Sequence, residues 1–325
     1  MEKIKNTKGI SSLKKTCKRF FAFLKSSPKF ATGLIILLFL LTLTLFAGLF
    51  TVHDPMFRYD GLYHTAPSSD HILGTTRLGR DVWSQTLYGG RKSIAVGLLA
   101  AGITTILAMT IGISSGYIGG MYDNIISIIT NVMMVIPSLV LLLIIAAMMG
   151  SVSPVLICLV IGFTSWPWGA RVLRAQTMSI RNRDFVRSAE TLGESKIRIL
   201  FFEIMPNMLS IISSSFVSTM IYAITAHATM EIIGFGDSSS VTWGMIINNA
   251  KNSGAFYSGY WWEIAGAVIG LVMLGLSLTL INFAIDEISN PKLKAQRIMK
   301  SYYKARKLEE RAKRKLAKNK MAEEV

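Results

Sequence analysis

The sequence predicts an all-α membrane protein with six transmembrane helices. Hydrophobic residues make up 51% of the 325 positions and charged residues only 17%, whereas a typical soluble domain carries about 25% charge. Lys and Arg outnumber Asp and Glu by 35 to 19, and these charges are separated from long apolar runs. This pattern excludes an ordinary soluble enzyme and a disordered chain. It also excludes a disulfide scaffold, because the two cysteines, Cys17 and Cys158, are interpreted as unpaired thiols.

Six apolar runs approach or exceed the roughly 20 residues that a membrane helix needs. Asp, Glu, Lys and Arg lie between these runs or at their edges, as expected if a central charge costs roughly 2.5–3.5 kcal/mol. The first run is longer than the core of a signal peptide, about 7–15 residues, so we interpret it as a retained helix. The predicted spans are 30–52, 93–117, 124–149, 155–170, 207–230 and 264–285.

The distribution of Lys and Arg predicts the orientation. Of the 35, 29 lie before residue 30, between the fourth and fifth spans, or after residue 290. Cytoplasmic segments of membrane proteins carry such an excess. We therefore expect the chain to lie in a bacterial cell (cytoplasmic or inner) membrane, with both termini in the cytoplasm. The domain organisation is then a basic N-terminal tail (1–29), a membrane domain (30–290) and a basic C-terminal tail (291–325).

The predicted spans contain glycines at close-packing spacing and two prolines. Gly112 and Gly116 form one GxxxG pair, and Gly266 and Gly270 form another. Such pairs let helices approach closely, either within the chain or against a partner chain. Two prolines in the third and fourth spans each remove a backbone donor and permit a kink; these are Pro137 and Pro167.

The predicted spans show no relay of ionisable groups for an ion or a proton. The predicted fifth span contains a histidine, His227, and Glu231 follows one turn later. Transporters coupled to ions usually place acidic groups at the membrane midplane. The chain also has no GxxxxGK[ST] phosphate loop, so the driving energy is expected to come from another protein. His227 is predicted either to line the transport pathway near its outer mouth or to make a hydrogen bond between packed helices.

The segment 183–206, between the fourth and fifth spans, is predicted to form two short helices on the cytoplasmic side. Asn182 or Asp184 is expected to cap the first helix. Gly193 is a natural stop, Ser195 can cap the second helix, and Pro206 opens the fifth span.

Phe185, Ala189 and Leu192 share one face of the first helix at positions i, i+4 and i+7. The small residues Ser188 and Ala189 would let this face enter a groove of another protein. The alternative is a solvated basic connector.

This segment resembles the cytoplasmic "EAA" loop of ABC importer permeases. Ser188, Ala189, Gly193 and Pro206 match that pattern. Arg187 replaces the acidic first position, and Glu203 falls where the pattern has an apolar residue, so the resemblance leaves the identity of the ATPase partner open.

A second segment, 71–93, is similar to the one before the second helix of dipeptide, oligopeptide and nickel permeases. Thr76 stands where that branch often has Asp. Similarity continues at 116–123, around Pro137, at 166–171, and up to Trp243 and Gly244, and so covers roughly 30–290. The chain most resembles the C type of the two paired peptide permeases. The matching positions in 71–93 are His71, Leu73, Gly74, Thr75, Leu78, Gly79, Arg80, Asp81, Ser84, Tyr88, Gly89, Arg91 and Ser93.

The resemblance implies a type I (MetI-like) bundle that transports short peptides together with a second, homologous permease, two cytoplasmic ATPases and an extracytoplasmic solute-binding protein. ATP and Mg²⁺ would bind the ATPases, and this chain would carry no cofactor and no catalytic residue. The alternative substrate is nickel or a metal–opine chelate. The residues expected to couple the chain to an ATPase are Phe185, Ser188, Ala189, Leu192, Gly193 and Pro206.

Two functions of other classes fit the sequence less well. A membrane enzyme would need clustered polar groups within the spans, and the sequence shows none. A channel that needs no energy source would conduct without ATPases.

The outer loops and the C-terminal tail carry weaker signals. The loop 234–262 could dock a binding protein or fold back on the bundle. The tail has a basic amphipathic pattern that favours binding to an anionic lipid leaflet over nucleic acid; bracing the ATPase is an alternative. The apolar positions of the tail are Ile298, Tyr302, Ala305, Leu308, Ala312 and Leu316.

Three histidines and three aspartates lie in the first outer loop. A metal site there is conceivable, because nickel is a substrate within the resembling branch, but the irregular spacing favours solvated loop residues. We therefore expect no metal site. These residues are His53, His64, His71, Asp54, Asp60 and Asp70.

Overall fold

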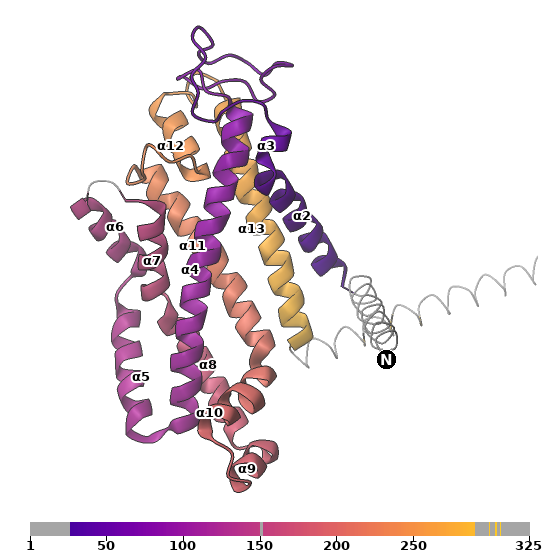
Figure 1. The fold of residues 1–325 in the computed structure, drawn as a ribbon, viewed down its shortest axis with the longest axis vertical. Coiled ribbons are helices and arrows are strands. Elements are labelled where there is room, and N and C mark those ends of the chain that lie inside the picture. Colours follow the sequence, from indigo (N-terminus) through magenta and orange to yellow (C-terminus); the bar gives the residue numbers. More distant parts are fainter. Residues whose placement is uncertain (1–26, 150–151, 290–298, 300–302, 304–305, 307–325) are drawn as a thin grey trace, which may run out of the picture.

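A long helix, α4, runs through the centre of the bundle (Figure 1), in a computed structural model that describes residues 27–149, 152–289, 299, 303 and 306. α4 has 37 residues and is therefore about 55 Å long. It packs most extensively against α8 on one side and α11 on another. The main helices are α2 (Pro28–Leu45), α4 (Val82–Ile118), α5 (Gly120–Val135), α6 (Ser138–Met149), α7 (Pro154–Thr164), α8 (Trp166–Arg181), α11 (Leu209–Ile233) and α13 (Trp262–Ser289).

Shorter helices lie near the two ends of this bundle. We call these ends the α9 end and the α12 end, after the helices that mark them in Figure 1. The short elements are α3 (Ala47–Phe50), α9 (Asp184–Thr191), α10 (Lys196–Arg198), a π-helical turn η1 (Ile199–Ile204), a 3₁₀ turn η2 (Met205–Met208) and α12 (Trp243–Asn252).

The described residues contain five helical segments long and apolar enough to cross a membrane, and α5 with α6 makes a sixth. These two helices meet at an angle of 66°, at Ile136 and Pro137. Proline cannot donate the backbone hydrogen bond that would continue the helix, so the bend predicted at Pro137 is confirmed. Pro167 lies in the first turn of α8, a position that tolerates proline.

α4 and α8 each extend about three turns beyond the predicted spans. α4 begins at Val82 rather than at residue 93, because the Asp81 carboxylate accepts a hydrogen bond from the Ser84 N–H at 2.6 Å and caps the helix. α8 continues to Arg181, and Arg174 within it forms a bidentate pair with Asp123 at 2.5 and 2.7 Å. Hydropathy alone detects the apolar part of each helix and misses its capped or paired polar end.

Both glycine pairs pack within the chain. A Cβ placed on Gly112 would lie 2.5 Å from the Ala170 carbonyl oxygen, and one on Gly116 would lie 2.6 Å from that of Arg174. One on Gly270 would lie 2.6 Å from the Trp243 ring. The small residues therefore let α4 approach α8, and let α13 approach α12.

We expect Gly112→Val to destabilise the bundle by about 1–3 kcal/mol, because the new side chain would collide with the α8 backbone. Gly102→Val is the matched control on the same helix, since nothing lies within 4 Å of a Cβ there. The thermal unfolding midpoint in detergent should fall for the first variant and stay near wild type for the second. Equal midpoints would contradict this packing.

The segment between α11 and α13 folds back onto the bundle. Trp243 is 1% exposed, and its indole N–H donates to the Thr86 carbonyl oxygen of α4 at 2.9 Å. α12 is thereby held against α4 and α13. The sequence left two alternatives for the loop 234–262, and the structure shows that the loop folds back onto the bundle. Docking of a binding protein on this loop stays a prediction.

The beginning of α2 and the end of α13 lie together, because Lys29 and Glu287 form an ion pair at 3.7 Å. In Figure 1 both point toward the α9 end. The N-terminal tail up to residue 26 and the named positions of the predicted amphipathic tail helix lie outside the described residues.

Candidate functional site: helix α9

The helix predicted after the fourth span is present as α9, Asp184–Thr191. Its N-cap residue is Arg183, and no side chain caps it, so the expectation that Asn182 or Asp184 caps the helix is wrong. Asp184 lies instead within the first turn, where its negative charge interacts favourably with the positive end of the helix dipole.

A glycine turn ends α9. Gly193 has a φ of +77°, and its N–H donates to the Glu190 carbonyl oxygen at 3.0 Å. The N–H of Glu194 donates to the Ala189 carbonyl oxygen at 3.1 Å. These two bonds form a Schellman motif, which requires a left-handed residue at this position. The predicted helix stop at Gly193 is confirmed.

The second predicted cap is also confirmed. The Ser195 hydroxyl oxygen accepts a hydrogen bond from the Arg198 N–H at 3.3 Å. The chain then continues through α10 and η1 toward α11. A well-defined turn therefore joins α9 to the next membrane-crossing segment.

α9 is anchored on one side and exposed on the other. Val186 is fully buried and Ala189 nearly so, in a cluster that includes Tyr117 of α4 and Leu173 of α8. Leu192 is 81% exposed. The predicted shared face is therefore divided, since Ala189 packs inward while Leu192, Phe185 and Ser188 are exposed.

Polar contacts strengthen the anchor. The Tyr117 hydroxyl, in the last turns of α4, donates to a Glu190 carboxylate oxygen at 2.8 Å. The anchoring residue Val186 was missed by the sequence reasoning, although its spacing of three from Ala189 is a helical pattern. α9 is thus fixed directly to the central helix.

Pro206 lies inside an irregular helical stretch rather than at its beginning. The fifth membrane-crossing segment extends from Lys196 to Ile233, and Pro206 falls in the 3₁₀ turn η2 that follows the π-helical turn η1. The Asn207 side-chain amide donates to the Glu203 carbonyl oxygen at 2.7 Å. Such irregular turns often mark functional positions.

The exposed side of α9 is hollowed. A shallow depression is available to a side chain from another protein, beside the exposed Leu192. The depression is lined by Asp184, Arg187, Ser188, Thr191 and Leu192.

A second hollow, of about 360 Å³, lies where the bend between α5 and α6 faces α8 and α11. The Ser138 and Tyr222 hydroxyls lie 2.9 Å apart in its wall, and Pro167 and Trp168 contribute from α8. The α5–α6 bend and the junction between α7 and α8 therefore both adjoin this hollow.

His227 lies elsewhere, buried in the α11 helix at 1% exposure. Its Nε2 is 3.4 Å from a Glu231 carboxylate oxygen, and the Thr242 hydroxyl donates to the same oxygen at 2.7 Å. Its surroundings are atoms of its own chain near α12. A role in the pathway stays a prediction.

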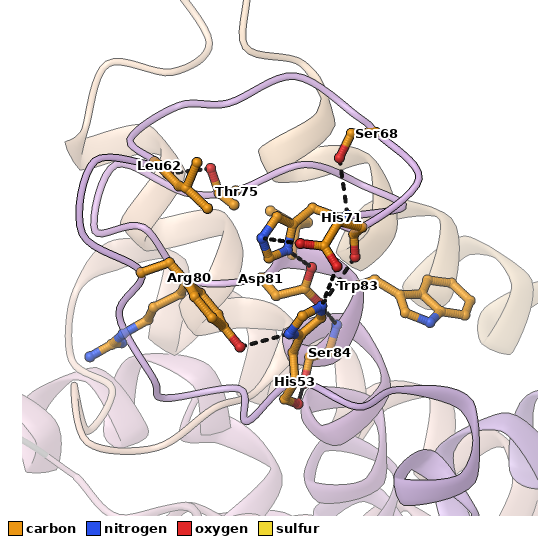
Figure 2. A network of polar contacts seen from close by, with 12 residues as sticks. His53, Leu62, Ser68, His71, Thr75, Arg80, Asp81, Trp83 and Ser84 are labelled. Atoms are coloured by element: carbon orange, nitrogen blue, oxygen red, sulfur yellow. Dashed lines mark hydrogen bonds and ion pairs between the residues drawn. The ribbon is translucent and has the colours of Figure 1, made fainter.

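The loop between α3 and α4, residues 51–81, forms a compact cap at the α12 end (Figure 1 and Figure 2), and it includes positions 71–81 of the segment that carries the family resemblance. Gly74 and Gly79 both have a φ of +66°. The buried Thr75 hydroxyl donates to the Leu62 carbonyl oxygen at 2.5 Å and accepts from the Thr65 N–H at 3.0 Å. These residues therefore fix the fold of the cap.

Fold and site together define a multi-pass helical membrane protein with one short, anchored helix exposed at the end of its bundle. Residues 108–295, more than half of the chain, match the family described as "Binding-protein-dependent transport system inner membrane component". The chain belongs to this family, which confirms the resemblance stated from the sequence.

Named relatives agree with this membership. The dipeptide transport system permease protein DppC of Bacillus subtilis strain 168 is 28% identical, over 83% of this chain and 84% of its own length. The "Probable D,D-dipeptide transport system permease protein DdpC" of Escherichia coli K12 is 30% identical, over 83% and 89%. A structure titled as inward-facing conformations of the MetNI methionine ABC transporter covers 63% of this chain and 94% of its own, with 17% identity and a TM-score of 0.49.

Proposed function

We propose that the chain is the permease subunit of an ATP-driven ABC importer for dipeptides or oligopeptides. It forms the pathway with a second, homologous permease and receives peptide from an extracytoplasmic solute-binding protein. Two cytoplasmic ATPases bind ATP and Mg²⁺, and this chain itself is not catalytic. The family match and the names of the relatives support the substrate class.

The observation that carries this proposal is the two-sided placement of α9. Val186 and Ala189 bind it to the core shared by α4, α8 and α11, while Leu192 remains exposed. An ATPase bound to the exposed side of α9 would, when it moves, also displace the membrane helices that contact the buried side of α9. Closure of the ATPases would then tilt the membrane helices as rigid bodies.

The proposal places the α9 end in the cytoplasm. Residues before 30, residues 171–206 and residues after 290 together carry 29 of the 35 basic residues, and such an excess is typical of the cytoplasmic side. The pairing of Lys29 with Glu287 supports placing both termini on one side.

The hollow beside the α5–α6 bend is the proposed part of the pathway within this chain. Its hydroxyls on Ser138 and Tyr222 can exchange hydrogen bonds with peptide groups. It lies between the α5–α6 bend and the α7–α8 junction. Helices that are broken at these points could rearrange during transport and so change the shape of the hollow.

Reconstitution tests the proposal. The chain, its permease partner, the ATPases and the binding protein are placed in liposomes, and uptake of labelled dipeptides and longer peptides is measured with and without ATP on the ATPase side. We expect uptake only when ATP and every subunit are present. Peptide uptake by the chain without ATPases, or ATP-driven transport that excludes peptides, would contradict it.

A further inference from the structure

Three ligand-type side chains converge in the cap at the α12 end. His53, Asp70 and His71 each offer one nitrogen or oxygen atom, and these atoms lie within 4.8 Å of one another. The two imidazole rings are 4.6 Å apart between centroids. Figure 2 shows both rings turned toward the same space. The expectation that these loop residues are solvated therefore fails for part of the set, because three of them lie close together. His71 is only 3% exposed.

The orientation of His71 is fixed by a carboxylate. Its Nδ1 lies 2.8 Å from an oxygen of the buried Asp81, whose other oxygen caps α4 through Ser84. Nδ1 therefore carries the proton and donates it to Asp81. Nε2 is left as an acceptor, and it has no hydrogen-bond partner among the described residues.

A buried acceptor without a partner is costly and uncommon. A histidine held at one nitrogen by a carboxylate, with the other nitrogen open, is the usual arrangement around a bound metal ion. Asp81 and His71 have this arrangement.

His53 presents a second nitrogen. Its Nδ1 is 2.6 Å from the Tyr59 hydroxyl, and its backbone carbonyl oxygen accepts from the Ser84 hydroxyl at 2.6 Å. Its Nε2 lies 3.1 Å from the Asp70 backbone carbonyl oxygen, which can only accept, so in this structure Nε2 donates and Nδ1 accepts from Tyr59. Binding a cation requires the other tautomer, in which Nδ1 donates to the Tyr59 oxygen and Nε2 exchanges that carbonyl for the metal ion. That Nε2 lies 3.7 Å from one carboxylate oxygen of Asp70.

Asp70 supplies the negative charge of the proposed site, and its side chain can move to complete the ligand geometry. Its second oxygen lies 3.9 Å from the open Nε2 of His71. Ligands about 2.0–2.1 Å from a tetrahedral ion are about 3.3 Å from each other. The three ligand atoms now lie within 4.8 Å of one another, so the site closes when Asp70 rotates and the imidazole rings move slightly inward. The side chain is 80% exposed and free to make that rotation.

The donor set selects the type of metal. Two imidazoles and one carboxylate suit Zn²⁺, Co²⁺ or Ni²⁺, whereas Mg²⁺ and Ca²⁺ prefer sites built from oxygen ligands alone. A water molecule can take the open position on the exposed side.

We propose that His53, Asp70 and His71 bind one divalent transition-metal ion of the zinc type, which ties the cap to the start of α4. This proposal replaces the expectation from sequence that the loop holds no metal site. It does not depend on the transported substrate.

Cobalt is the probe, because Co²⁺ absorbs visible light much more strongly when a protein holds it in four-coordinate geometry than when it is free in water. The full-length chain is purified in detergent, freed of any affinity tag and of metal, and titrated with Co²⁺. We expect one Co²⁺ per chain with a visible band, and displacement of this band by Zn²⁺. Asp70→Asn and His53→Gln should each weaken binding by about tenfold or more.

Asp60→Asn is the matched control, since Asp60 is an exposed aspartate of the same loop outside the cluster. It should bind Co²⁺ like the wild type. Zn²⁺ should also raise the thermal midpoint of the wild type and of Asp60→Asn, but not that of Asp70→Asn. The absence of saturable binding by the wild type, or wild-type binding by either Asp70→Asn or His53→Gln, would overturn the proposal.

Discussion

Gly193→Pro is expected to reduce ATP-driven uptake to about one hundredth of the wild-type rate or less. Proline cannot adopt the φ of +77° at this position, and it removes the N–H that donates to Glu190. Strain and the lost bond together cost about 3 kcal/mol, a factor of about 100 in the population of the turn. Uptake into cells or proteoliposomes, at equal membrane abundance, is the measurement.

Gly193→Asn is the control for this substitution. Asparagine tolerates the left-handed conformation, and nothing lies within 4 Å of a Cβ at this position. This variant should therefore retain most of the uptake. Wild-type uptake by Gly193→Pro would show that the shape of the turn does not matter for coupling.

Leu192→Asp is expected to separate the ATPases from the permease while the chain itself stays folded. The side chain is 81% exposed, so the change costs the isolated chain little. If Leu192 is buried in an ATPase, its contact contributes about 1.5–3 kcal/mol, and a desolvated carboxylate adds a further penalty. We expect the ATPases to dissociate during purification and uptake to fall by about tenfold or more.

Met121→Asp provides the comparison. Met121 is 80% exposed and lies in the first turn of α5, outside α9 and its turn. Introducing the same charge there should leave ATPase binding unchanged. Similar losses in both variants would mean that charge anywhere at this end of the bundle is harmful, and that Leu192 has no special role.

The sequence predicts much of the fold because its strongest signals are local. Apolar runs predict the membrane helices, Pro137 predicts the bend, and Gly193 predicts the end of α9. Each signal acts through the backbone of its own segment, so no knowledge of distant contacts is needed. The same holds for the Ser195 cap.

What the sequence could not predict depends on contacts between distant segments. Arg174 lies inside a membrane-crossing helix because Asp123 of another helix pairs with it. His53 and His71 are separated by a loop whose fold brings their rings together. Hydropathy and spacing contain no information on such pairs.

For α9, the sequence predicted the presence of the helix but not which of its sides faces the bundle. The helical period places Phe185, Ala189 and Leu192 on one face, yet the chain buries Val186 and Ala189 and exposes Leu192. Only the position of the neighbouring helices decides which side of α9 faces inward. That position makes Leu192 the more informative residue for a test of docking.

Crosslinking from position 192 in intact cells tests the central claim most directly. A photoreactive amino acid replaces Leu192 in the full-length chain, and the crosslinked protein is identified by mass spectrometry after irradiation. The account predicts a crosslink to a cytoplasmic ATPase that contains a phosphate-binding loop. A crosslink to an extracytoplasmic protein would contradict it, as would labelling of position 192 by reagents that cannot cross the membrane.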